Sequence, residues 1–260
     1  MSKPVIVAVF NHKGGSGKTT VAFNTAAAFH QRGKRVLMVD LDSQANLTQA
    51  VGLQPRLHVG LLLTNSEESF HEWDDVLVQG QGDKKGLDLL PGKSTLIGSE
   101  AILGMSHSIF QLRELLDQRP YDVVVLDCPP SLGPLTRNAL NAAHYYVVPL
   151  PAENFAWQGL DRLVKEAAKI GRETNPDLKL AGVLKNKYAS QTLFAKQMDQ
   201  ALIDSDLPVF NTTIRTTIGL MESPSQQQSI FEYAPKNNKG VIDMNNFVDE
   251  LEAIIFSHPN

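Results

Sequence analysis

The sequence predicts an α/β protein whose mostly parallel, twisted sheet carries helices on both faces. Short apolar runs, typical of buried strands, alternate with longer segments of helical spacing. A glycine-rich segment, Asn11–Thr20, follows the first of these runs and leads into a helix. Two further apolar runs end on aspartate, at Asp40 and Asp127. Because the carboxyl ends of parallel strands meet at one edge of a sheet, we expect these polar residues to lie together.

The expected strands are short runs of β-branched and other apolar residues, each bounded by polar residues, glycine or proline. They are Val5–Phe10, Arg35–Val39, Leu87–Leu90, Tyr121–Leu126, Tyr145–Leu150 and Leu180–Leu184.

The expected helices show apolar residues at intervals of three and four. They are Thr19–Gln31, Asn46–Val51, Ser99–Asp117, Leu135–Ala143, Trp157–Arg172, Gln191–Ile203 and Asp243–Phe256. Residues 53–86 are polar and contain several glycines, which predicts irregular surface loops. The chain has no linker-like stretch and no internal repeat, so we expect a single domain over residues 1–260.

The composition limits the classes of function. The chain has 260 residues, 42% of them hydrophobic, and a net charge of −4, so any contact with nucleic acid needs a local basic patch or one assembled in an oligomer. Cys128 is the one cysteine, which excludes a disulfide framework or a C-x-x-C metal site within one chain. No signal peptide and no apolar run of the roughly 20 residues that span a bilayer is present. A cytoplasmic protein fits these features.

The segment Asn11–Thr20 has the composition of a phosphate-binding turn. Glycines let consecutive backbone N–H groups point inward around a phosphate, and the amino end of the following helix adds a positive dipole. Lys18 can then reach the β- and γ-phosphates, and the Thr19 hydroxyl can ligate Mg²⁺. The usual pattern G-x-x-x-x-G-K-[ST] needs glycine at position 12, where this chain has His12, and a second lysine stands at Lys13. The alternative is a glycine-rich turn with two incidental lysines.

The run Lys-Gly-Gly-Ser-Gly-Lys-Thr-Thr that begins at Lys13 resembles the deviant Walker A box of the ParA/MinD family of P-loop ATPases. The resemblance implies ATP and Mg²⁺ as cofactors, with Lys13 and Lys18 both catalytic. It also implies an ATP-dependent homodimer in which each Lys13 reaches the phosphates held by the partner, since a cation supplied in trans accelerates phosphoryl transfer strongly. The implied nucleotide-binding residues are Gly14, Gly15, Ser16, Gly17, Lys18, Thr19 and Thr20.

Asp40 and Asp42 follow the second expected strand, and Asp127 ends the fourth. Carboxylates at this edge can orient water or hold Mg²⁺, although an aspartate here can also cap the following turn. The resemblance implies that Asp42 is catalytic and positions the attacking water, and that Thr19, Asp40 and Asp127 contribute to the metal site. Ser43 stands where the family usually has proline.

The base pocket and a DNA surface have weaker signals. Asn186 follows the strand Leu180–Leu184, and the resemblance assigns it to the adenine edge, although asparagine is also common in turns that end strands. The segment Thr213–Ser225 resembles a family segment that lines the nucleotide pocket and the dimer face, with Gly219 where many relatives have a basic residue. The basic residues expected to contact DNA are Arg215, Lys187 and Lys196.

The resemblance favours a ParA-type ATPase that dimerises on ATP and binds DNA without sequence preference. Hydrolysis stimulated by a partner would then cycle the protein to segregate or position a plasmid, a chromosome or a protein cargo. The expected partner is a centromere-binding or cargo-adaptor protein, and no membrane is expected. The expected location is the cytoplasm, in association with the nucleoid.

Other branches of the family are alternatives. A MinD-like membrane ATPase needs a basic amphipathic tail, whereas Phe247–Phe256 is acidic and its apolar face is expected to pack in the core. An iron–sulfur carrier needs paired cysteines, and a scaffold without ATPase activity would not need Lys18, Asp42 and Asp127. A positioning ATPase for a protein cargo, without a direct role in DNA segregation, also remains open.

Overall fold

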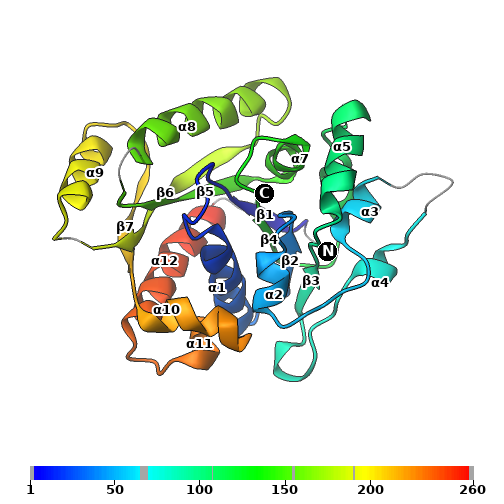
Figure 1. Ribbon diagram of the computed structural model, residues 1–260, viewed down its shortest axis with the longest axis horizontal. Helices are drawn as coiled ribbons and strands as arrows, with labels where there is room; N and C mark the ends of the chain where they lie inside the picture. The colour runs from blue at the N-terminus through cyan, green and yellow to red at the C-terminus, as the bar shows by residue number, and fades with distance from the viewer. Residues whose placement is uncertain (1–2, 65–69, 107, 154–155, 190, 258–260) are drawn as a thin grey trace.

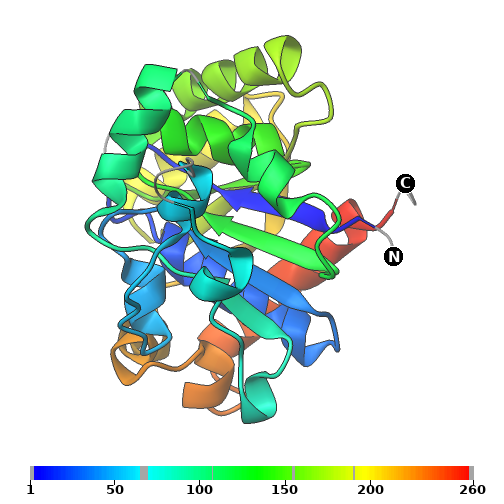
Figure 2. The same ribbon diagram turned by 90° about the vertical axis from the view of Figure 1, so that its right-hand side faces the viewer.

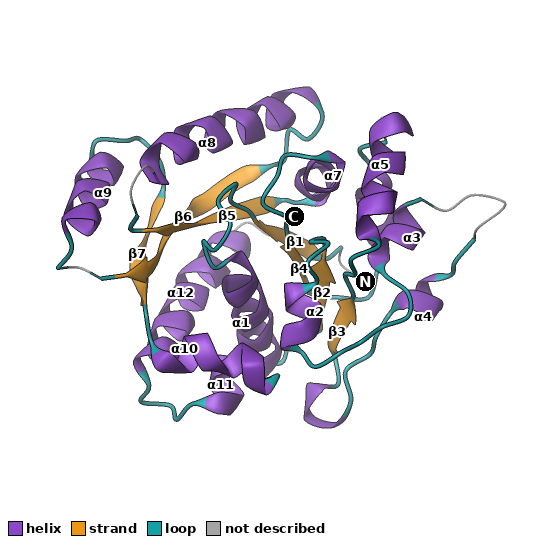
Figure 3. Cartoon of the chain, in the orientation of Figure 1, coloured by secondary structure: helices purple, strands orange, loops and turns teal. Residues whose placement is uncertain are grey.

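A seven-stranded sheet in the order β3-β2-β4-β1-β5-β6-β7 forms the centre of the molecule, in which neighbouring strands pair in parallel. The computed structural model describes residues 3–64, 70–106, 108–153, 156–189 and 191–257. Helices cover both faces of the sheet (Figures 1 and 3). The predicted fold class is therefore confirmed, and the expectation of a single domain stays a prediction.

The strands lie close to where the apolar runs predict them. Their bounds are β1 Val5–Val9, β2 Val36–Asp40, β3 Leu87–Leu90, β4 Val123–Asp127, β5 Tyr145–Pro151, β6 Lys179–Tyr188 and β7 Val209–Arg215. All residues of β2 and β4 are buried, as expected for parallel strands covered on both faces. The register places Asp127 opposite both Asp40 of β2 and Val9 of β1. This register brings two aspartates and the glycine-rich segment to one edge of the sheet.

Two apolar cores lie on opposite faces of the sheet, and successive residues of β1 point into them alternately. Ile6 and Ala8 face the core beneath α5, α6, α7 and α8, whereas Val7 and Val9 face the core beneath α1 and α12. The longer helices are α1 Lys18–Gln31, α5 Leu96–Ser106, α6 Gln111–Leu116, α7 Pro134–Ala142, α8 Ala156–Glu173, α9 Leu193–Ile203 and α12 Lys239–Ile255. The start of β1 and the end of α12 lie at the edge of the sheet opposite to the glycine-rich segment (Figure 2).

Short helical turns complete the chain. They are α2 Asn46–Ala50, α3 Val59–Leu63, α4 Trp73–Val76, α10 Ile218–Glu222, α11 Ile230–Tyr233 and the 3₁₀ turns η1 Gly82–Lys84 and η2 Ser223–Gln226. The apolar face of α12 is buried, as the sequence predicts, with Phe247 and Leu251 fully inaccessible. Within the described part of the chain, no helix is both long and apolar enough to cross a bilayer.

The prediction that residues 53–86 are wholly irregular is wrong. The segment contains α3, α4 and η1, and Leu62 and Leu63 of α3 are buried against the core. The Arg119 guanidinium lies 4.0 Å from the ring centroid of Trp73 in α4. This cation–π contact links the segment to the residues that precede β4. The apolar residues of this segment therefore pack against the core, and short helices form around them.

The single helix predicted over Ser99–Asp117 is also wrong, because α5 ends at Ser106 and α6 begins at Gln111. The side chain of Asn138, on α7, stabilises the break. Its Nδ2 donates to the Ser108 carbonyl at 2.8 Å, and its Oδ1 accepts the Leu112 N–H at 3.2 Å. These bonds satisfy backbone groups that a continuous helix would have paired internally.

Strand β7 was not predicted from the sequence. It is an edge strand in which buried residues, such as Phe210 and Ile214, are separated by exposed or half-buried polar ones. Glu250 of α12 accepts the N–H groups of Asn211 and Thr212 at 2.8 and 2.7 Å, so a helix side chain satisfies the outer edge of the strand. An edge protected in this way is less available for pairing with another chain.

Candidate functional site

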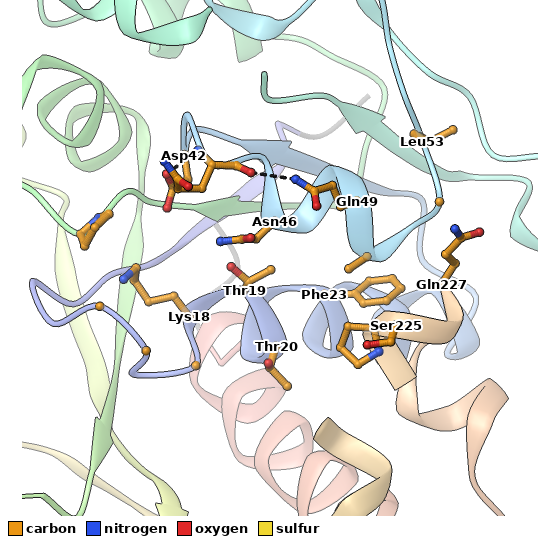
Figure 4. A pocket seen from close by; sticks show the side chains of 18 of the residues that line it. Lys18, Thr19, Thr20, Phe23, Asp42, Asn46, Gln49, Leu53, Ser225 and Gln227 are labelled. Carbon is orange, nitrogen blue, oxygen red and sulfur yellow. Dashed lines mark hydrogen bonds between the residues drawn. The ribbon is translucent and has the colours of Figure 1, made fainter. Parts of the chain in front are cut away.

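A cavity of about 760 Å³, lined by both polar and apolar residues, opens at the carboxyl edge of the sheet. Figure 4 shows its walls: the glycine-rich loop and the start of α1 on one side, Asp42 and α2 on the other. Residues of η2 and the end of β6 complete it. The lining includes Gly14, Gly15, Gly17, Lys18, Thr19, Thr20, Asp42, Lys187, Pro224 and Ser225. The structure therefore gathers most of the predicted nucleotide-binding residues around one cavity of a size suited to a small-molecule ligand.

The glycine-rich loop joins β1 to α1 through left-handed backbone at Gly15 and Gly17, with φ values of 75° and 84°. Such φ values are accessible to glycine at no steric cost. Among the described residues no side chain caps the amino end of α1, and the first turn of this helix holds no acidic residue. The N–H groups and the positive end of the helix dipole thus remain available to an anion in the cavity.

Lys18 is the first residue of α1, and its side chain lies along the loop. Its Nζ donates to the Lys13 carbonyl at 3.3 Å, and the residue is 7% exposed. Burial lowers the pKa of Lys18, while nearby Asp127 and Asp42 oppose that shift. The ammonium is therefore held in a partly desolvated position where its attraction to a phosphate is stronger than in water.

Thr19 lines the cavity, and it contacts Asp127, which is buried and does not line it. The Thr19 hydroxyl donates to Oδ2 of Asp127 at 2.7 Å, and Oδ1 of Asp127 is buried without a hydrogen-bond partner among the residues that the structure describes. Burial, reinforced by the charge of Asp40, raises the pKa of Asp127. An unsatisfied buried carboxylate oxygen beside a threonine hydroxyl matches the oxygen ligands that Mg²⁺ prefers. The residues present therefore fit a magnesium ion.

Asp40 is fully buried and does not line the cavity. Its Oδ2 accepts the N–H and the hydroxyl of Thr48 at 2.9 and 2.7 Å, and its Oδ1 accepts the N–H of Asp42 at 3.2 Å. Burial raises the pKa of Asp40 to about 6. A Cβ on Gly92 would lie 2.8 Å from Cγ of Asp40, so the carboxylate is enclosed. Asp40 thus holds the loop after β2, and its predicted contribution to the metal site stays a prediction.

Asp42 lines the cavity and is 9% exposed. Its Oδ1 accepts the N–H of Gln44 at 2.9 Å, and its own N–H is bound to Asp40. Two short-range hydrogen bonds therefore fix the Asp42 backbone and side chain opposite Lys18 (Figure 4). A carboxylate held in this way can orient a water molecule, as the sequence predicts.

Lys13 lies outside the cavity lining. Its N–H donates to Oδ1 of Asn11 at 2.9 Å, and its Nζ forms an ion pair with Glu153, which follows β5. Both side chains are partly exposed, at 39% and 51%. The two lysines of the loop therefore point to different places, Lys18 along the cavity and Lys13 toward the surface.

Asn186 and Ser16 are the two predicted nucleotide-binding residues that do not line the cavity. The Asn186 amide donates to the Ser16 carbonyl at 2.8 Å, and the Lys187 ammonium donates to the Gly15 carbonyl at the same distance. Both residues belong to the end of β6 and contact backbone carbonyls of the glycine-rich loop, and Lys187 also lines the cavity. The roles predicted for them, adenine recognition and DNA contact, stay predictions.

The three candidate DNA contacts lie on one flank. Lys187 is at the end of β6, the neighbouring Tyr188 pairs with Arg215 of β7, and Lys196 is exposed on α9. The Arg215 guanidinium is paired with both oxygens of Asp243 on α12, at 2.9 and 2.6 Å. Its positive charge is therefore already largely neutralised within the chain.

The sequence did not identify the residues of α2 that face the cavity. Asn46 and Gln49 of α2, and Gln227 after η2, line the wall opposite the phosphate loop. One signal in the sequence could have identified these α2 residues as cavity lining. Helix α2 begins a few residues after Asp40, which ends β2, and Asp42, which follows it.

Comparison with known proteins places this site in a family. Residues 4–180 match the family model described as an AAA domain. The chromosome-partitioning ATPase Soj of Thermus thermophilus is 39% identical over 232 residues, covering 88% of each chain. The sporulation initiation inhibitor protein Soj of Bacillus subtilis is 32% identical, covering 89% of this chain and 92% of that protein.

Solved structures of related proteins have the same fold as this chain. Cobyrinic acid a,c-diamide synthase from Mycobacterium smegmatis, with a bound ATP analogue and magnesium, is 34% identical with a TM-score of 0.80, covering 96% of this chain and 95% of that one. The septum site-determining protein MinD from Pyrococcus horikoshii, at 20% identity and a TM-score of 0.77 over 98% of each chain, shares the fold. With its lysine-bearing loop, its buried aspartate and these relatives, this chain belongs to the ParA-like family of P-loop ATPases.

Proposed function

We propose that this chain is a partition or positioning ATPase that converts ATP and water to ADP and phosphate with Mg²⁺ as cofactor. The observation that carries the proposal is that Lys18 and Thr19 line one end of the cavity and that Thr19 is bonded to the buried Asp127, one oxygen of which has no partner among the described residues. The similarity to chromosome-partitioning ATPases and to a structure with an ATP analogue and magnesium supports it.

The proposal assigns a role to several residues that line the cavity and to Asp127, which is bonded to one of them. The amino end of α1 and Lys18 bind the phosphates, and Thr19 and Asp127 hold Mg²⁺, which neutralises phosphate charge when bound. Asp42, fixed by its bonds with Gln44 and Asp40, orients the attacking water. Pro224 and Ser225 of η2 line the part of the cavity farther along α1 and would border the nucleoside.

Lys13 serves a second subunit in this proposal. Its ion pair with Glu153 is between partly exposed groups, and such pairs contribute at most about 1 kcal/mol. The lysine can therefore leave Glu153 for the phosphates of a partner at little cost. ATP would join two subunits into a homodimer, and hydrolysis would separate them.

The proposed cycle includes DNA and a partner protein. The ATP dimer would bind duplex DNA without sequence preference through the flank that carries Lys187, Lys196 and Arg215. A centromere-binding or cargo-adaptor protein would stimulate hydrolysis and release the dimer from the nucleoid. Positioning of a protein cargo without DNA segregation is the variant of this function that the same cavity would serve.

Calorimetric titration with ATP and Mg²⁺, combined with a phosphate-release assay, tests the proposal. The wild-type chain should bind ATP and release phosphate slowly, and Lys18→Ala should bind no measurable ATP. Lys236→Met removes an exposed lysine away from the cavity and should bind ATP like the wild type. Equal ATP affinity in the wild type and Lys18→Ala would contradict the assigned role of the cavity.

A further inference from the structure

Two carbonyl groups of the glycine-rich loop accept hydrogen bonds from the end of β6. The Ser16 carbonyl accepts the Asn186 amide, and the Gly15 carbonyl accepts the Lys187 ammonium, each at 2.8 Å. Asn186 lies outside the cavity lining, whereas Lys187 is part of it. These contacts join residues 170 and 172 positions apart in the sequence, so a single short segment of another strand holds the loop.

The planarity of the peptide bond gives these contacts a consequence for the cavity. In a trans peptide the C=O of one residue and the N–H of the next point in opposite directions. The Asn186 amide, which lies outside the cavity lining and holds the Ser16 carbonyl, thus directs the Gly17 N–H to the cavity side. The Lys187 ammonium, by holding the Gly15 carbonyl, fixes the direction of the Ser16 N–H. A phosphate cradle needs consecutive N–H groups that point inward.

The local packing holds the Asn186 and Lys187 side chains in these positions. Asn186 is 4% exposed, and a Cβ on Gly17 would lie 2.3 Å from its Nδ2, so the amide fills the space that glycine leaves. Lys187 has a left-handed backbone with φ of 50°, which is uncommon for a residue other than glycine. Asn186 is in register with Pro151 of β5, which anchors the segment in the sheet.

We propose that Asn186 and Lys187 are positioning residues for phosphate binding, which fix the Ser16 and Gly15 carbonyls and so preset the N–H groups that receive the phosphates. The inference rests on the proposed binding of ATP in this cavity. It gives Asn186 a role independent of the nucleobase, and gives Lys187 a role within the ATPase site in addition to its proposed place on the DNA-binding flank.

The experiment separates the phosphate cradle from the base by using Mg²⁺ with inorganic tripolyphosphate, ATP and GTP as calorimetric probes. Asn186→Leu keeps the approximate volume of the side chain and removes its donor, and Lys187→Met does the same for the lysine. We expect each variant to bind tripolyphosphate roughly tenfold more weakly, because one hydrogen bond is lost. The affinities for ATP and for GTP should fall by the same factor. Asn186→Asp, which places a carboxylate against the Ser16 carbonyl, should lose more.

Two control variants test whether the loss of affinity is specific to residues that contact the glycine-rich loop. Asn175 is also a buried asparagine, whose amide donates to the Leu140 and Ala143 carbonyls at 2.8 Å, far from the loop. Asn175→Leu should lower thermal stability and leave tripolyphosphate affinity unchanged. Lys236→Met removes one positive charge and should also leave that affinity unchanged.

The outcomes are distinguishable. A wild-type chain that binds neither ATP nor tripolyphosphate would remove the proposed function itself. If the wild type binds both and Asn186→Leu loses affinity for ATP alone, Asn186 reads the base and the inference is overturned. Unchanged tripolyphosphate affinity in both variants overturns it as well. If Asn186→Leu does not fold, the exposed Lys187→Met variant decides on the same criteria.

Discussion

The hydroxyl of Thr19 donates a hydrogen bond of 2.7 Å to Oδ2 of Asp127, so the first turn of α1 is tied to the end of β4 across 108 residues of sequence. The other oxygen of Asp127 is buried and has no hydrogen-bond partner within the described part of the chain. A buried unsatisfied acceptor is costly, and a bound ion is one of the explanations for it. This pair is therefore where the proposed Mg²⁺ site would lie.

Asp127→Asn should weaken the dependence of nucleotide binding on magnesium. Asparagine keeps the volume and one oxygen, which can still accept from Thr19, but it removes the negative charge that would hold the ion. We expect the Mg²⁺ concentration for half-maximal binding of ATP to rise at least about tenfold, as for loss of a charged ligand interaction. The measurement is a Mg²⁺ titration at fixed ATP, and an unchanged midpoint would exclude Asp127 from the metal site.

Asp42→Ala should retain ATP binding and stop turnover, because Asp42 lies on the wall opposite Lys18 and in the proposed mechanism orients water rather than binding phosphate. With ATP, this variant should accumulate as a dimer, seen by size-exclusion chromatography with light scattering. Adding Lys13→Ala to it should return the protein to a monomer, since the lysine would no longer bridge the subunits. Normal hydrolysis by Asp42→Ala would remove this residue from the mechanism.

The parts of the fold that the sequence predicted are those whose signals are local. The buried strands carry contiguous apolar runs, and the phosphate loop carries its glycines and lysines within ten residues. Asp40 and Asp127 could be placed together because parallel strands bring their carboxyl ends to one edge. Only the register in the structure adds that they lie directly opposite each other.

The parts that could not be predicted depend on contacts between distant residues. Asn138 separates α5 from α6 through bonds to backbone groups 26 and 30 positions away, and no pattern within residues 99–117 reveals it. The pairing of Arg215 with Asp243 and the contact of Asn186 with Ser16 are equally invisible in the sequence. The family resemblance suggested adenine for Asn186, and positive charge suggested DNA for Arg215; both roles stay predictions, and the intramolecular partner that each side chain meets is supplied by the fold.

His144 should make folding stability depend on pH. Its Nδ1 accepts the Ile6 N–H at 3.0 Å, and burial lowers its pKa below 6.5, with Arg113 and Lys3 adding to the shift and Asp177 opposing it. The unfolded chain then binds more protons in acid, so stability is full above pH 6.5 and falls as the pH drops toward the lowered value. His144→Asn keeps an acceptor without the titration. Urea midpoints from pH 7.5 to 5.5 should fall less for the variant, and parallel curves would contradict this.

DNA binding should require ATP and should fall steeply with salt, because a chain of net charge −4 binds a polyanion only through a surface that dimerisation doubles. Lys196→Ala should weaken binding to all sequences alike and flatten the salt slope by about 1 for each phosphate that the lysine no longer neutralises. Arg215→Ala should have a second effect, since it leaves the buried Asp243 without its guanidinium partner and should cost about 1–3 kcal/mol of stability. Fluorescence anisotropy on random duplexes with ATP, ADP or no nucleotide measures the first effect, and urea denaturation the second. Binding that is equal in all nucleotide states would contradict the proposed switch, and a fully stable Arg215→Ala protein would contradict the structural role of its ion pair.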